Sequence, residues 1–366
     1  MLTFDHITTE FLLESTLFYG ANGNPLLAPR GVWMVNGKLI VADTGQNRVF
    51  IWDELPTEKH RDPSVTLGQQ DATATKRNSG QDVSASTLHY PSGIWSDGNK
   101  LIVADAWNHR VLIWTQFPQN NGQPADVVIG QPDFESNEPN VAGVGNDPSE
   151  SSLNWPYGVF SDGTSLWIAD TGNRRILYFN TIPDTSYKAA DEVIGKEDFS
   201  QRDYENTDPI WPYSVRISHE GKMAVTDTQY YRVLIWNDWK KSFKQKADVI
   251  IGQNSFEENG QNQFRLQPAA FTLNWCYDSF FHNEDIYIAD TGNSRILRFS
   301  PVPIKNNASA HDLIGHEDFG TGSENKKTMM GTANALYWPF SICIDNNLLA
   351  IADTGNHRVV LTDLIK

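Results

Sequence analysis

Short apolar runs alternate with polar turns along the whole chain, and no stretch keeps the 3.6-residue spacing of an amphipathic helix. Residues 88–130 show the unit well. Its four apolar runs are 88–95, 101–104, 110–114 and 126–130. Asp97-Gly98, a polar turn at 105–109 and a loop with Pro and Gly separate these runs, which are rich in β-branched and aliphatic residues. The pattern predicts four antiparallel strands joined by hairpins.

This unit recurs along the chain, and each copy is marked by an Asp, a polar turn and an Arg five residues after the Asp. The six pairs are Asp43/Arg48, Asp105/Arg110, Asp170/Arg175, Asp227/Arg232, Asp290/Arg295 and Asp353/Arg358. Repeats of this size made of four strands are typical of β-propeller blades. We therefore expect an all-β fold, a six-bladed β-propeller of four-stranded antiparallel blades, in one domain covering 1–366 with its repeats at 28–366.

The last repeat ends at Lys366, just past its third strand, so its blade lacks a fourth strand. The segment Leu17–Gly20 precedes the first repeat and resembles an isolated fourth strand with its terminal Gly. Pairing this segment beside the last blade would cover an otherwise open sheet edge. We expect residues 1–27 to supply the strand that closes the ring.

The phrase Ala-Asp-Thr-Gly-Asn-x-Arg-[Val/Ile], preceded by Pro-x-Gly and an aliphatic strand, resembles the NHL repeat. The resemblance covers residues 28–362 in six copies, and the ending Gly130-Gln-Pro-Asp-Phe134 resembles a common bacterial variety. It implies a six-bladed propeller. Such propellers include RNA-binding modules, protein-interaction platforms and a few lyases, so the resemblance does not fix one function.

The recurring Asp and Arg admit a chemical and a structural interpretation. Acid–base or anion-binding groups would explain the residue types, but one active site does not need six identical copies. We favour a structural role, in which each Asp accepts hydrogen bonds from the turn and each Arg ties its strand to the turn or to a neighbouring blade.

Aromatic residues cluster at the start of the innermost strand in four consecutive repeats. Trp155, Trp211, Trp275 and Trp338 precede the Pro of that strand, or Cys276 in its place, and Tyr157, Tyr213, Tyr277 and Phe340 follow it. The first two repeats have Arg30 and Ser92 at the second of these positions. Because these residues border one mouth of the channel, they either plug it or line a ligand pocket with Arg30 as its strong cation. Both interpretations stay open.

Two turns between the second and third strands depart from the repeat. Trp107 replaces the usual Gly in the second repeat, and the fourth repeat has Tyr230 and Tyr231. Exposed aromatic side chains do not help a hairpin turn. We therefore take these three residues as candidates for contact with a partner, with drift of the repeat as the alternative.

The formal charge of −16 argues against nucleic acid as a partner, since that affinity requires clustered Lys and Arg. No run reaches the length of a membrane span, and the first residues lack an export signal. We expect no membrane span, a monomer, and a cytoplasmic location for the chain as written, or an exported one if a signal was removed. The two cysteines cannot form a disulfide framework, and we expect both to be buried thiols.

The usual catalytic motifs are missing: there is no His-Glu-x-x-His, no Gly-x-Ser-x-Gly, no Walker loop and no Cys-x-x-Cys. The amidating lyase that shares this repeat holds a metal with histidines just after the Pro, and none of the six matching positions here is His. Asp278 alone resembles that family's calcium ligand. A single carboxylate is few for calcium, which takes six to eight oxygens. No cofactor is predicted, and Asp278 is a weak calcium candidate.

Three hypotheses follow. The favoured one is a binding module whose aromatic channel mouth and variable turns take a peptide, protein or glycan. The second is a lyase or hydrolase in the channel mouth that uses Asp278, Arg30 and tyrosine hydroxyls, with or without a metal. The third is a purely structural ring within a larger assembly.

Overall fold

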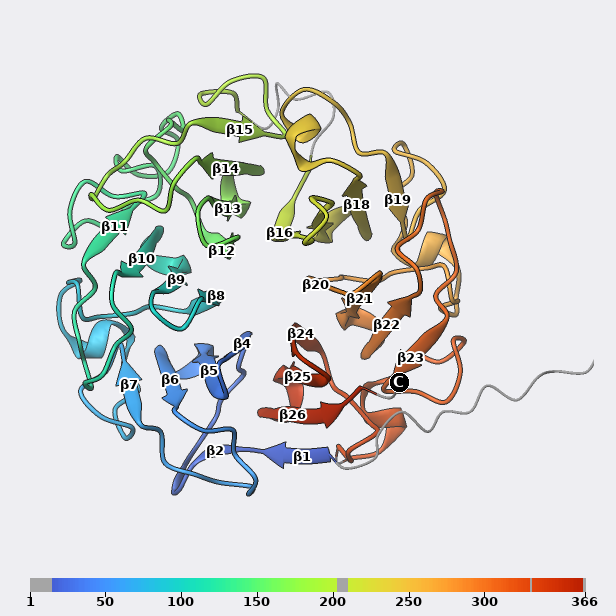
Figure 1. The fold of residues 1–366 in the computed structure, drawn as a ribbon, viewed down its shortest axis with the longest axis horizontal. Helices are drawn as coiled ribbons and strands as arrows, with labels where there is room; N and C mark the ends of the chain where they lie inside the picture. Colours follow the sequence, from blue (N-terminus) through green and yellow to red (C-terminus); the bar gives the residue numbers. More distant parts are fainter. Residues whose placement is uncertain (1–14, 203–209, 330, 365–366) are drawn as a thin grey trace, which may run out of the picture.

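The computed structural model describes residues 15–202, 210–329 and 331–364. Six four-stranded antiparallel sheets stand around a central axis, as Figure 1 shows, and each sheet is one blade. The first strand of each repeat lies innermost and the fourth lies at the outer rim. The predicted all-β, six-bladed propeller is confirmed.

The blades follow the sequence repeats in order. Blade 1 contains β4 (Gly31–Val35), β5 (Lys38–Asp43), β6 (Arg48–Trp52) and β7 (Val65–Leu67); blade 2 contains β8 (Pro91–Ser96), β9 (Leu101–Asp105), β10 (Arg110–Trp114) and β11 (Val127–Ile129). Blade 3 contains β12 (Pro156–Ser161), β13 (Leu166–Asp170), β14 (Arg175–Phe179) and β15 (Glu192–Ile194); blade 4 contains β16 (Pro212–Ile217), β17 (Met223–Asp227), β18 (Arg232–Trp236) and β19 (Val249–Ile251). Blade 5 contains β20 (Asp278–His282), β21 (Asp285–Asp290), β22 (Arg295–Phe299) and β23 (Asp312–Ile314); blade 6 contains β24 (Pro339–Asp345), β25 (Leu348–Asp353), β26 (Arg358–Asp363) and β1 (Ser15–Phe18).

The last blade takes its outer strand from the other end of the chain. Ser15 to Phe18 of β1 pair antiparallel with Thr362 to Val359 of β26. Phe18 is fully buried, and its ring meets that of Trp52 in blade 1 edge-on at 4.8 Å. The predicted closure by the N-terminal segment is confirmed for residues 15–18. Residues 1–14, which include the stretch searched for an export signal, lie outside the described residues.

A short 3₁₀ turn connects the second and third strands of each blade. The Asp that ends the second strand stands opposite the Arg that begins the third, so the repeated phrase closes a hairpin of fixed length. The turns are η1 (Thr44–Gln46), η3 (Ala106–Asn108), η4 (Thr171–Asn173), η6 (Thr228–Tyr230), η9 (Thr291–Asn293) and η11 (Thr354–Asn356). Among the described residues, no helix combines the length and apolarity needed to cross a bilayer.

Candidate functional site

The channel mouth is built from the residue that follows the Pro of each innermost strand. In β12, β16 and β24 the pairing register shifts directly after that Pro, so Tyr157, Tyr213 and Phe340 have no partner in the ladder. A bulge of this kind re-aims one side chain out of the sheet. In these three blades the bulge thus directs one large side chain into the mouth.

These side chains contact one another around the axis. Tyr157 stacks on Tyr213 with ring centroids 4.5 Å apart, Tyr213 meets Tyr277 edge-on at 4.4 Å, and Tyr277 stacks on Phe340 at 4.2 Å. Rings in such contact leave no passage between them. The aromatic residues after the Pro, or after Cys276 in its place, thus form one cluster of rings around the channel mouth.

Arg30 completes the ring of contacts. Its guanidinium lies over the ring of Phe340 at 4.1 Å and donates a hydrogen bond from Nη1 to the Tyr213 hydroxyl at 3.1 Å. Arg30 comes from blade 1 and Tyr213 from blade 4, on opposite sides of the ring in Figure 1. The side chain of Arg30 therefore reaches across the channel axis.

Tyr90 belongs to the same cluster, although it was not among the site residues predicted from the sequence. Its ring lies 5.1 Å from the Arg30 guanidinium and 6.5 Å from the ring of Tyr157. Tyr90 precedes Pro91, the position at which later repeats have Trp. An aromatic residue at this position of the repeat was therefore the signal in the sequence, but only the tryptophans were predicted to lie at the mouth. Ser92, the residue after the Pro, is instead buried.

Trp107, in the turn η3, contacts the residues of the channel mouth. Its indole stacks on Tyr90 at 4.5 Å, and its Nε1 donates to the Tyr157 hydroxyl at 3.1 Å. The side chain remains 44% exposed. The structure thus brings the candidate turn residue and the candidate mouth residues into one surface, which we call the aromatic platform: Arg30, Tyr90, Trp107, Tyr157 and Tyr213.

A polar pocket of about 650 Å³ adjoins the exposed side of this platform. Trp107 and His89 form part of its wall, together with the charged residues Arg77, Asp82 and Glu135. An aromatic face beside amide, carboxylate and guanidinium groups can stack against a planar or saccharide surface while hydrogen-bonding its polar groups.

The four tryptophans before the innermost strands contact the preceding blade. Each meets the residue that directly follows that blade's 3₁₀ turn, and this residue is in the left-handed conformation in every blade. The contacts are His109 Nδ1 with the backbone N–H of Trp155 (3.1 Å), Arg174 with the ring of Trp211 (4.1 Å), Tyr231 with the ring of Trp275 (5.4 Å) and Ser294 Oγ with the N–H of Trp338 (3.4 Å). Asn47 and His357 accept in the same way from the N–H groups of Tyr90 and Ala28. Trp155 and Trp338 nevertheless stay about half exposed.

The two tyrosines of the fourth turn lie apart from the platform. Tyr231 packs between blades against Trp275, and Tyr230 lies 4.9 Å from the guanidinium of Arg232. Tyr230 also lines a pocket of about 500 Å³ with Ile210 and Phe243. Tyr230 and Tyr231 therefore do not share a surface with Trp107.

Asp278 lies deeper in the channel and is paired. Its carboxylate contacts Arg216 at 2.9 Å and accepts from Ser341 Oγ at 3.0 Å and from the N–H of Ile342 at 3.1 Å. Rings of Trp33, Phe160 and Phe280 surround the Arg216 guanidinium at about 6 Å. Arg216 was not predicted from the sequence, although Phe160 and Phe280 occupy the same position in the repeats on either side of it. In the described part of the chain, no three His, Cys, Asp or Glu side chains are grouped to hold a metal ion.

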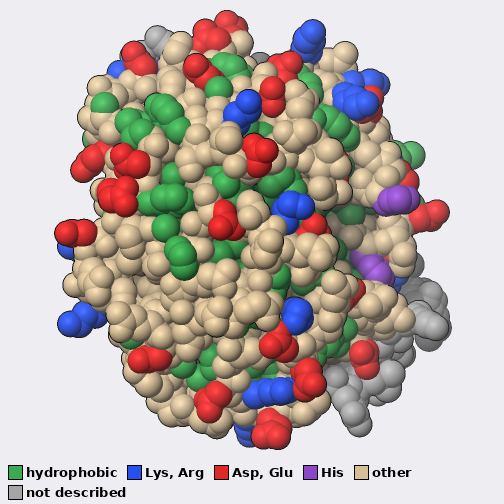
Figure 2. Space-filling view, turned by 60° about the vertical axis from the view of Figure 1, so that its left-hand side comes forward, with side chains coloured by type: hydrophobic (Ala, Val, Ile, Leu, Met, Phe, Trp, Pro, Cys, Tyr) green, Lys and Arg blue, Asp and Glu red, His purple; other side chains and the backbone are tan. Residues whose placement is uncertain are grey.

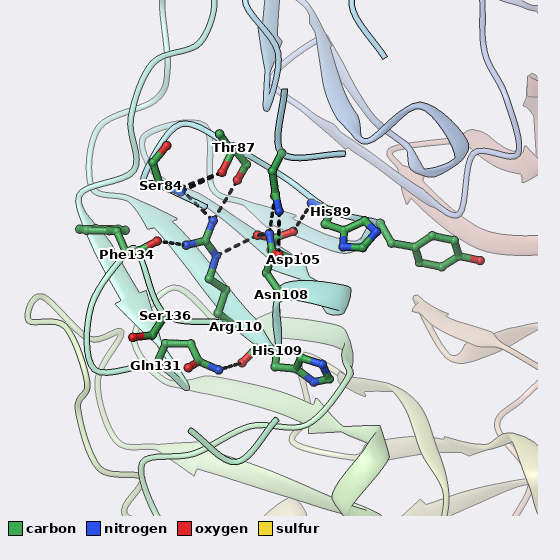
Figure 3. Close-up of polar contacts among 12 residues, drawn as sticks. Ser84, Thr87, His89, Asp105, Asn108, His109, Arg110, Gln131, Phe134 and Ser136 are labelled. Carbon is green, nitrogen blue, oxygen red and sulfur yellow. Dashed lines mark hydrogen bonds and ion pairs between the residues drawn. The ribbon is translucent and has the colours of Figure 1, made fainter. Parts of the chain in front are cut away.

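The repeated Asp and Arg lie inside the blades. In blade 2, shown in Figure 3, Asp105 accepts from Arg110 Nε at 2.8 Å and from the N–H of His89 at 2.6 Å. Arg110 donates further to carbonyl groups of Phe134, Ser84 and Thr87, which belong to the loops that flank the blade. All six pairs have almost no exposed side-chain surface. The structural interpretation of the repeat is confirmed.

The tyrosine hydroxyls of the mouth stay protonated, and those of Tyr157 and Tyr213 accept hydrogen bonds from Trp107 and Arg30. Burial raises the pKa of Tyr213 well above its ordinary value, raises that of Tyr277 to about 12, and raises that of Tyr157. Their hydroxyls therefore keep their protons at neutral pH, which does not suit a general base. Both cysteines, Cys276 and Cys343, are buried and free, as expected.

The ring is a six-bladed β-propeller, and its repeat is similar to the NHL repeat. The chain is 22% identical to NHL repeat-containing protein 2 of Bos taurus over 92% of its length and 46% of that protein's. The Homo sapiens protein of the same name gives the same values. The chain thus spans about half the length of these relatives. Among solved structures it resembles a Bacteroides thetaiotaomicron protein of unknown function, with 11% identity, a TM-score of 0.52, and coverage of 96% of this chain and 76% of the other. No protein-family model matches the chain.

Proposed function

We propose that this chain is a binding module whose aromatic platform and adjoining pocket take a peptide, protein or glycan ligand. One observation carries the proposal: Trp107 is exposed in a turn, yet it is fixed by Tyr90 and Tyr157 of the channel mouth. A hairpin turn gains nothing from an exposed indole. A ligand site gains a rigid, partly apolar surface with a polar edge.

The closed ring of side chains supports binding on top of the propeller. Tyr157, Tyr213, Tyr277 and Phe340 contact one another around the axis, and the side chain of Arg30 crosses it, so a ligand would lie across the mouth instead of entering the channel. The polar pocket beside Trp107 extends this surface outward. The acidic side chains spread over the face seen in Figure 2 and the net charge of −16 favour ligands other than nucleic acid.

Glycan and peptide arrays probed with the labelled protein test the proposal. Trp107→Ala and Trp155→Ala should each weaken the binding of array ligands by about tenfold or more, the usual effect of removing an aromatic contact from a binding centre. Tyr187→Ala is the matched control. Tyr187 is 39% exposed, but its backbone pairs with the outer strand β11, away from the mouth.

Two results would contradict this function. One is that the wild-type protein retains no ligand from either array. The other is that both tryptophan variants keep the wild-type affinity for every retained ligand. A loss of binding in the Tyr187 variant equal to that in the Trp107 variant would place the ligand elsewhere on the propeller.

A further inference from the structure

Arg30 is a cation with no acidic partner among the described residues. Its neighbours are the hydroxyl of Tyr213 and the rings of Phe340 and Tyr90. In a chain with a formal charge of −16, acidic side chains are plentiful. None of those described lies within ion-pair distance of this guanidinium.

The other arginines in the protein interior differ in this respect. Every fully buried Arg of the described chain has an Asp partner: the six repeat arginines pair with the repeat aspartates, and Arg216 pairs with Asp278. Removing a guanidinium from water without a counter-charge is costly. Arg30 is only partly exposed and lacks this compensation.

Two buried polar groups at the start of neighbouring innermost strands also lack hydrogen bonds. Arg30 Nε and Ser92 Oγ have no partner, and Ser92 is 2% exposed. Both residues follow the Pro of an innermost strand, in neighbouring blades 1 and 2, and the backbone of Gly31 in β4 lies against that of Ser92 in β8. The later blades place aromatic rings at this position. The ring of the mouth therefore has one polar sector, in which Arg30 Nε and Ser92 Oγ have no partner.

We propose that this polar sector binds a carboxylate group of the ligand, with Arg30 and Ser92 as donors and the Tyr213 hydroxyl beside them. The proposal deepens the proposed function and rests on it. The Tyr213 hydroxyl accepts from Arg30, so its own proton remains available to an anion. Guanidinium–carboxylate hydrogen bonds are short and strong, and they supply the counter-charge that Arg30 lacks.

The aromatic platform favours a particular kind of chemical group next to the carboxylate of the ligand. Tyr90 contacts both Arg30 and Trp107, so the exposed indole lies one ring away from the cation. A ligand that places a carboxylate on Arg30 would lay its next group over Tyr90 and Trp107. A uronic acid and the free C-terminus of a peptide with an aromatic side chain share this chemistry.

Matched pairs of small probes test the carboxylate. D-Glucuronate is compared with D-glucose, and N-acetylphenylalanine with its amide, by calorimetric or NMR titration of the whole chain. In at least one pair the acid should bind about tenfold more tightly than its neutral counterpart, the usual value of a hydrogen bond to a charged group. The pair that shows the difference identifies the source of the carboxylate.

Variants then assign the preference to the polar sector. Arg30→Met should abolish the difference between acid and neutral probe, Arg30→Lys should retain part of it, and Ser92→Ala should reduce it. The ratio within a pair does not depend on how much of a variant is folded, so a destabilised Arg30→Met protein remains informative. Trp107→Ala should weaken both members of a pair and leave their ratio unchanged.

Equal affinity for acid and neutral probe in both pairs would overturn the carboxylate site. So would the failure of all four probes to bind at about 10 mM, or a preference that survives in Arg30→Met. If array ligands still bind in a Trp107-dependent manner, the proposed function stands without the carboxylate. If no ligand depends on Trp107 or Trp155, the proposed function itself fails.

Discussion

Arg30 Nη1 donates a hydrogen bond to the hydroxyl of Tyr213, 3.1 Å away, from the opposite side of the propeller. The two residues are 183 positions apart in sequence and occupy the same place in blades 1 and 4. This bond joins opposite blades directly at the axis. Deeper in the channel, Arg216 of blade 4 extends over the ring of Trp33 in blade 1. Contacts between opposite blades thus cross the axis at two levels.

The bond across the axis should contribute measurably to stability. Tyr213→Phe keeps the ring contacts with Tyr157 and Tyr277 but removes the acceptor of Arg30, so we expect a loss of about 1–3 kcal/mol in the free energy of unfolding by denaturant. The matched control is Tyr277→Phe. Its hydroxyl has no hydrogen bond among the described residues, and the change should cost under about 0.5 kcal/mol. Equal effects of the two variants would show that the bond contributes nothing.

The repeated Asp should matter for folding through its Arg. Asp170→Ala leaves Arg175 buried and without its counter-charge, which should cost about 3–5 kcal/mol in the free energy of unfolding. Glu54→Ala removes an exposed partner of Arg61 at a similar distance of 3.0 Å and should cost less than about 1 kcal/mol. A small effect at Asp170 would argue against the structural role of the repeat.

His109 should make the stability depend on pH. Burial lowers its pKa from 6.5 to about 4, and its Nδ1 must stay unprotonated to accept from the N–H of Trp155. Between these two pH values the unfolded chain binds a proton that the folded chain does not, so stability falls as the pH drops from 6.5 towards 4. His109 should contribute about 2 kcal/mol of this loss at pH 5.

His109→Asn separates this contribution from those of other groups. Asn47 already accepts from the N–H of Tyr90 at the same position of blade 1, so the new side chain can preserve the contact without titrating. Urea unfolding at pH 7 and at pH 5 should show a smaller difference for the variant than for the wild type. Identical differences would mean that His109 titrates normally in the folded protein.

A calcium site at Asp278 and the pairing of Asp278 with Arg216 predict opposite effects of Ca²⁺ on stability. Because its oxygens already accept from Arg216, Ser341 and Ile342, we expect chelation with EDTA and addition of Ca²⁺ to leave the thermal midpoint unchanged. Asp278→Ala should destabilise the protein by about 3–5 kcal/mol, since Arg216 then lacks its partner. A Ca²⁺-dependent rise of the midpoint that Asp278→Asn abolishes would establish a metal site.

Removal of the closing strand should open the ring. A protein starting at residue 19 loses the pairing of β1 with β26 and the buried ring of Phe18. We expect a loss of at least about 3 kcal/mol, read as a lower thermal midpoint, together with association through the exposed edge on size-exclusion chromatography. A truncated protein that keeps its midpoint and elutes like the full chain would show that closure is dispensable.

Much of the fold could be predicted because each blade is defined locally. The alternation of apolar runs and turns determines the strands, and the fixed distance from Asp to Arg determines the hairpin. Counting strands was enough to find that the last blade needs the segment around Leu17. Repetition also indicated that Asp170 and its equivalents belong to the interior, because six equal copies cannot all serve one site.

The candidate site was only partly predictable. Trp107 stood out because it breaks the repeat, and Tyr157 and Tyr213 because they recur after the Pro. Tyr90 and Arg216 break the repeat too, but their importance comes from partners in distant blades. Nothing in the local sequence indicated that Tyr231 would pack against Trp275 while Trp107 would join the mouth.

The sequence by itself determined the six blades, the closing strand and the structural role of the Asp and Arg, since these depend on spacing within one repeat. Only the tertiary structure decided which of the residues that break the repeat contact one another. The ring places blades 1 and 4 face to face, and the bulge after the Pro in blades 3, 4 and 6 directs Tyr157, Tyr213 and Phe340 towards the axis. Arg30 therefore meets Tyr213, and Trp107 meets Tyr90 and Tyr157, through distances and directions that no one-dimensional pattern contains.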